Sequence, residues 1–184
     1  DGGYIVVGTI YMQTTENDVY LVKFDSQGNS LFAKVHGTTS DEFGWDVQQT
    51  STGGYIITGQ KVVVGNAWDV LLIKTFSNGN EAYTKTFGGT LTDVGQSVQQ
   101  SDDEGFIITG YTSSLGSGGP DVWLIKTDQD GNEEWNRTIG GSGDDFGKSI
   151  QQTDDGGYII TGHTSSFGNG GLDIWLIKTD FLKK

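Results

Sequence analysis

The sequence has 184 residues with 30 Gly, one Pro and no Cys, and its formal net charge is −13. Without Cys there are no disulfides and no thiolate chemistry, and the acidic balance disfavours nucleic acid and anionic membrane surfaces as partners. No apolar run approaches the roughly 20 residues that span a bilayer, so we expect no membrane insertion. Aromatic residues make up 11% of the chain, which with the many Gly residues predicts short packed strands joined by tight turns.

Four short elements follow one another along the chain and return with a period of about 51 residues. The first element carries its aromatic residue at Tyr4, Tyr55, Phe106 and Tyr158. The second begins at Asp18, Asp69, Asp121 and Asp173. The third has its aromatic residue at Phe32, Tyr83 and Trp135, and the fourth contains Gln48-Gln49, Gln99-Gln100 and Gln151-Gln152. The four registers agree, so we place repeats near 1–52, 53–103, 104–155 and 156–184, about 3.5 copies in all.

Each element has the pattern of a β-strand, and no stretch shows the period of a helix. Val122–Ile125 is apolar at every position, as expected for a strand buried between two neighbouring sheets. Gly131 and Asn132 can supply the positive φ of a hairpin turn in Asp128–Asn132. Four antiparallel strands per repeat of this length predict an all-β fold, a β-propeller of four-stranded antiparallel blades. A β-sandwich of repeated hairpins is the alternative.

Two segments, Trp135–Gly141 and Gln151–Tyr158, resemble the repeats of secreted and cell-surface bacterial and archaeal β-propellers, whose core reads Trp-Asn-Lys-Thr-Phe-Gly-Gly. The first two copies depart from that core at Phe32–Gly37 and Tyr83–Gly88. The resemblance implies a propeller in an extracellular or cell-surface location, with the glutamine strand innermost in each blade. It brings no catalytic residue.

With the glutamine strand first in each blade, the chain divides into three strands, two full blades and three strands. Three strands at each end cannot merge into one four-stranded blade. Residues 1–184 are therefore expected to form a single propeller domain or a propeller fragment. Its ring would be completed by missing blades or by homo-oligomerisation, which buries the aromatic residues at the ends.

Recurring polar residues are expected to serve the architecture. The Asp series that begins at Asp18 and the Lys series that begins at Lys23 predict a polar ladder between blades or turn caps, with a ligand site in each blade as the alternative. Asp128, Asp130 and Asn132 alternate like the first ligands of a calcium loop but lack its Gly and Glu, which favours a hairpin turn over a metal site. His36 and His163 have no partner at zinc-ligand spacing.

Trp45 and Trp68 lie near links between strands and are the candidates for stacking on a glycan or protein ligand. No polar constellation is unique to one copy at the level of these motifs. The expected function is therefore non-enzymatic binding or scaffolding on a secreted or cell-surface protein, without a cofactor. The alternatives are part of a propeller glycosidase or lyase whose catalytic residues lie in missing blades, and a structural repeat of a fibre or surface layer.

Overall fold

The computed structural model describes residues 2–12, 16–63, 65 and 67–180, and this part of the chain forms fourteen β-strands in four antiparallel sheets without a helix. The first sheet contains β1 (Tyr4–Met12), β2 (Glu16–Phe24) and β3 (Ser30–His36). The second contains β4 (Glu42–Gln49), β5 (Tyr55–Val62), β6 (Trp68–Thr75) and β7 (Glu81–Phe87). The third contains β8 (Asp93–Gln100), β9 (Phe106–Thr112), β10 (Asp121–Thr127) and β11 (Glu133–Ile139). The fourth contains β12 (Asp145–Gln152), β13 (Tyr158–Thr164) and β14 (Asp173–Thr179).

The all-β prediction is confirmed, and the strands fall into sheets of three, four, four and three, as expected when the glutamine strand comes first in each blade. Within each sheet the strands pair in chain order, so every connection is a hairpin. The turns that close the last hairpin of the first three sheets place Gly28, Gly79 and Gly131 at φ between 75° and 86°, where a Cβ would be strained.

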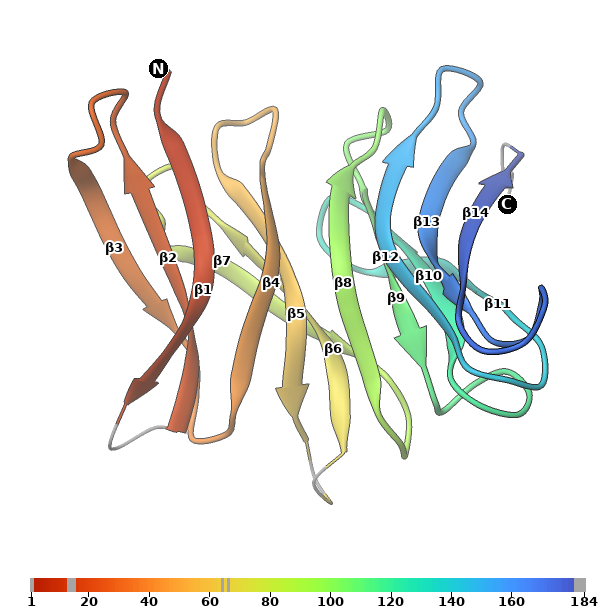
Figure 1. Ribbon diagram of the computed structural model, residues 1–184. Coiled ribbons are helices and arrows are strands. Elements are labelled where there is room, and N and C mark those ends of the chain that lie inside the picture. Colours follow the sequence, from red (N-terminus) through yellow and green to blue (C-terminus); the bar gives the residue numbers. More distant parts are fainter. Residues whose placement is uncertain (1, 13–15, 64, 66, 181–184) are drawn as a thin grey trace.

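The four sheets stand side by side in chain order, with the first and last sheets at opposite ends of the row (Figure 1). Strands β4, β8 and β12 lie along the near edge of this row, and β7 and β11 lie at the far edge. Three clusters of buried apolar side chains fill the spaces between consecutive sheets. We call these spaces the first, second and third interfaces. The core is therefore divided into layers between sheets.

The third strand of each full sheet is buried on both faces, as its apolar run predicts. All seven residues of β10 are buried, because the second sheet covers one face and the fourth sheet covers the other. Strand β14 occupies the same repeat position, but its residues alternate between partly buried and exposed. Ile174 is 95% exposed and Leu176 is 62% exposed, whereas their counterparts Val122 and Leu124 are fully buried. The fourth sheet thus has one apolar face that no described part of the chain covers.

Candidate functional site

The recurring acidic residues hold loops in place. The Asp93 carboxylate accepts hydrogen bonds from the Thr112 and Ser114 hydroxyls and from the Gly89 N–H, and Asp145 repeats this with Thr164, Ser166 and Gly141. These bonds to Asp145 keep the pKa of its carboxyl below its usual value against the effect of burial. Each carboxylate thereby fastens the loop that enters its sheet to a loop within the sheet.

Two members of the Asp series that begins at Asp18 also bind loop backbone. Asp121 accepts a hydrogen bond from the Ser117 N–H at 2.8 Å, and Asp173 accepts one from the Asn169 N–H at 3.1 Å. Of the Lys series, Lys126 is paired with Asp103 at 2.9 Å and Lys178 with Asp155 at 2.8 Å. The turn-cap prediction is confirmed for Asp121 and Asp173, and these polar residues serve the fold.

At the first interface this pattern changes. Glu42 stands at the position of Asp93 and Asp145, and Lys61 stands where the later sheets have Thr112 and Thr164. Glu42 is buried, accepts a hydrogen bond from the Thr38 hydroxyl at 2.6 Å, and forms an ion pair with Lys61 at 2.8 Å. A buried carboxylate with a paired ammonium thus replaces the neutral hydroxyl arrangement of the other two interfaces.

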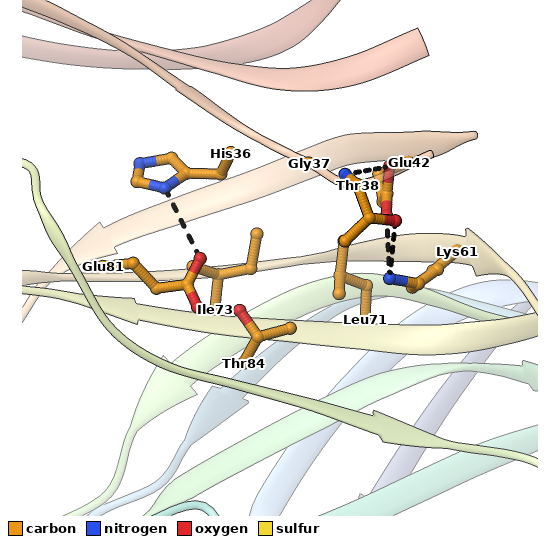
Figure 2. A pocket seen from close by; sticks show the side chains of 9 residues that line it. All are labelled: His36, Gly37, Thr38, Glu42, Lys61, Leu71, Ile73, Glu81 and Thr84. Carbon is orange, nitrogen blue, oxygen red and sulfur yellow. Dashed lines mark hydrogen bonds and ion pairs between the residues drawn. The ribbon is translucent and has the colours of Figure 1, made fainter. Parts of the chain in front are cut away.

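A cavity of about 170 Å³ lies beside this ion pair, between β3 of the first sheet and β5–β7 of the second. Figure 2 shows His36 and Glu81 at one end, and Thr38, Glu42 and Lys61 at the other. Between the two ends the wall is formed by Leu71, Ile73 and Thr84. Polar groups at both ends of an apolar wall are the composition of a small-ligand site, and the volume lies below the roughly 300–1,000 Å³ of pockets for drug-sized ligands.

The repeat explains why the cavity is open at this interface. Leu71 pairs with Gly59 of the neighbouring strand, and Trp123 pairs with the equivalent Gly110 in the third sheet. Trp123 is only 3% exposed, packs between the second and third sheets, and donates its indole N–H to the Asn136 Oδ1 at 3.2 Å. The smaller Leu71 leaves open at the first interface the space that an indole fills at the second.

His36 is a second departure. It occupies the position of Phe87 and Ile139, which pack against the apolar clusters of the second and third interfaces. His36 is 6% exposed, and its Nδ1 lies 3.8 Å from Glu81 Oε2. Burial lowers the pKa of His36, and Glu81 opposes that shift only in part. The imidazole is therefore neutral at pH 7, and its buried Nε2 has no hydrogen-bond partner among the residues that the structure describes.

With Glu42 and Lys61 neutralising each other and His36 uncharged, Glu81 leaves the lining with a net negative charge. Thr38, Glu81 and Thr84 are exposed, whereas His36, Glu42 and Leu71 are buried. The exposed residues mark the side from which a ligand reaches the cavity. The arrangement can hold a small ligand against the apolar wall and give it hydrogen bonds.

Trp45 and Trp68, the aromatic candidates of the sequence, come together on the ring of Phe43. Trp45 stacks on it with centroids 5.9 Å apart, and Trp68 meets it edge-on at 5.4 Å. Trp45 is 50% exposed and donates its indole N–H to Gln60 Oε1 at 3.3 Å, while Trp68 is partly buried. The pair forms an aromatic surface, but neither residue lines the cavity.

The Asp128, Asp130 and Asn132 group forms a turn. The Asp128 carboxylate accepts hydrogen bonds from the Asp130 N–H, the Asn132 N–H and the Asn132 side-chain amide, which lower its pKa. Its oxygens are thereby occupied within the hairpin. Among the residues that the structure describes, no three His, Cys, Asp or Glu side chains gather where they could hold a metal ion.

The cavity residues Glu42, Lys61 and Glu81 do not belong to the repeated motifs, whereas Leu71 lies in the second repeated element, which begins at Asp69. Departure from the repeat is the signal that could have identified these cavity residues other than Glu81. It applies to Glu42, Lys61, Leu71, His36 and Thr84. Each of them differs from its counterparts in the later copies, and all of them face one interface.

No protein-family model matches the chain, and no curated protein matches it. Among solved structures, the crystal structure of a protein of unknown function from Bacteroides caccae is similar, with a TM-score of 0.48 and 7% sequence identity. The similarity covers 83% of this chain and 51% of that chain, so this chain spans about half the length of that protein. A TM-score below 0.5 at this identity assigns neither a fold nor a function. The described part of the chain contains no helix that could cross a membrane.

Proposed function

We propose that the four sheets are blades of a β-propeller and that the chain serves as a non-enzymatic module for binding or scaffolding. Three features support the blade assignment: a period of about 51 residues, sheets that pair their strands in chain order, and the alignment of β4, β8 and β12 along one edge of the row (Figure 1). A secreted or cell-surface location is part of the proposal and rests on the resemblance of the repeats.

One observation carries the proposal, a sheet-to-sheet junction that recurs at the repeat period. Gln48 Oε1 accepts a hydrogen bond from the Gln100 N–H at 2.7 Å, and Gln100 Oε1 accepts one from the Ser51 N–H at 2.8 Å. Between the third and fourth sheets the same two bonds return, with Gln152 N–H to Gln99 Oε1 at 2.6 Å and Asp102 N–H to Gln152 Oε1 at 3.0 Å.

Among the described strands, β4, β8 and β12 are edge strands that pair along one side only, and glutamine side chains bond the backbone along the other side. A junction of this kind joins one sheet to the next without fusing them into one sheet. On β12 the corresponding positions are the Gln151 side chain and the Asp154 N–H, where a further blade would attach.

The uncovered face of β14 points to the same conclusion. Ile174 and Leu176 occupy the positions that Val122 and Leu124 use to bind the next sheet. Burying two such side chains stabilises an assembly by about 1.5–3 kcal/mol each. We propose that this face receives further blades of the same ring or the first sheet of a second copy. Loop hydrogen bonds to Asp121 and Asp173 and ion pairs of Lys126 and Lys178 support a non-enzymatic role for these recurring residues.

Analytical ultracentrifugation of the chain tests the proposal. We expect concentration-dependent association through the uncovered face, and we expect the double substitution Ile174→Thr and Leu176→Lys to abolish it. Leu91→Lys with Leu115→Lys is the matched control, because these exposed leucines lie in links outside that face. A compact, closed monomer in small-angle scattering, or association that the double substitution leaves intact, would contradict the proposal.

A further inference from the structure

The internal repeat provides a template for what fits the cavity between the first and second sheets. At the second interface the Trp123 side chain is only 3% exposed and belongs to the apolar cluster against which Phe87 packs. Its N–H is bonded to Asn136 Oδ1, which belongs to the neighbouring strand β11. One chain thus contains a filled and an unfilled version of the same site.

The hydrogen-bond acceptor of the indole and the neighbouring Phe87 position both have counterparts around the cavity. Thr84 stands at the position of Asn136, so its hydroxyl is placed to accept a hydrogen bond from a ring N–H or O–H. His36 stands at the position of Phe87, so one wall of the cavity carries an aromatic ring. Leu71 and Ile73 supply the apolar surface.

We propose that this cavity binds a planar aromatic ring carrying one hydrogen-bond donor, such as an indole or a phenol. The ring is either a free small molecule or an aromatic side chain of another protein. The inference names a ligand class for the binding role in the proposed function, but it rests on the cavity alone and does not require a closed ring of blades.

The size of the cavity agrees with this ligand class. A cavity of about 150 Å³ is enough for benzene in a protein core, and this cavity measures about 170 Å³ and opens beside Thr84 and Glu81. A second ring or a stem can therefore extend toward the opening. The N–H or O–H of the ligand donates a hydrogen bond to the Thr84 hydroxyl, while its ring packs against the apolar wall.

Charge narrows the ligand class further. Glu81 gives the lining a net negative charge, and the whole chain carries −13. An anionic ring is disfavoured by this field, and a cationic one is favoured. We expect tryptamine to bind more tightly than indole, and indole-3-acetate to bind more weakly than indole.

Titration with indole, followed by calorimetry and by ¹H–¹⁵N NMR, tests the site. We expect saturable binding, with shifted resonances at His36, Leu71 and Thr84. Leu71→Trp places the chain's own indole in the cavity and should abolish binding. Thr84→Val keeps the shape but removes the acceptor, and it should weaken binding about two- to tenfold.

Leu172→Trp is the matched control, because it adds an indole at an exposed link of the fourth sheet and should bind like the wild type. N-acetyltryptophanamide distinguishes the two possible origins of the bound ring. If it binds as tightly as indole, the ring is a side chain of another protein; if it does not bind, the ring is a free small molecule. If folded wild-type protein does not bind indole, or if Leu71→Trp binds it as well as the wild type does, the proposal is wrong. Neither result depends on the association test of the end face.

Discussion

The substitution Trp123→Leu gives the second interface the residue that the first interface has at Leu71. The resulting change in unfolding free energy measures how much the indole stabilises the protein. Trp123 is 3% exposed and lies among Val70, Leu72 and Phe106. The space that Leu leaves can be read from the first interface, where the cavity is about 170 Å³. At about 24 cal/mol per Å³ of cavity, this volume corresponds to about 4 kcal/mol.

The expected loss is about 2–4 kcal/mol of unfolding free energy, because the cavity opens toward solvent and its neighbours relax in part. That is a large share of the roughly 5–15 kcal/mol that stabilises a typical domain. Urea denaturation followed by circular dichroism is the assay, with a lower midpoint at an unchanged slope as the expected result.

Trp45→Leu is the control of the same chemistry, because Trp45 is half-exposed and lies outside the interfaces; we expect it to cost less than about 1 kcal/mol. If Trp123→Leu costs no more than Trp45→Leu, the indole does not fill the second interface. The explanation of the cavity by Leu71 would then fail with it.

His36→Phe should raise stability at pH 7 by about 1–3 kcal/mol, because it removes a buried Nε2 that has no partner. It should also flatten the pH dependence. The pKa of His36 is lower in the folded state than in the unfolded state, so the wild type loses stability as the pH falls below about 6.5, and urea titrations between pH 7 and pH 5 would reveal the difference. Gln48→Ala should cost about 1 kcal/mol by leaving the Gln100 N–H unpaired, whereas Gln49→Ala, at an exposed neighbouring position, should cost less than about 0.5 kcal/mol; equal midpoints in denaturation would speak against the glutamine junction.

Strand identity and order could be predicted because they depend on neighbours in the sequence. The apolar run Val122–Ile125 and the turn at Gly131 act over a few residues, and the repeat supplies several independent readings of each. The grouping into three, four, four and three strands also needed the resemblance to known propeller repeats, which implies that the glutamine strand comes first in each blade. Burial of both faces of β10 could also be inferred, since its central run Val122–Ile125 is apolar at every position.

The glutamine pairs show the limit of this reasoning. Their recurrence is plain in the sequence, but the Gln48 side chain bonds a backbone N–H about 50 residues away. No local pattern states which backbone group a side chain meets across two sheets. The same holds for Trp45 and Trp68, which share Phe43 as a common partner only after β4 and β6 are placed in one sheet.

The sequence by itself determined an all-β chain, the strands and turns of each copy, and the residues that repeat. Packing alone decided that His36, Leu71 and Thr84, which come from β3, β6 and β7, surround one cavity. Each of the three is an ordinary substitution in its own strand, compatible with the local structure. Together they leave a cavity because side chains from both sheets must fill the space between them. Whether that space is filled therefore depends on residues that are far apart in the sequence.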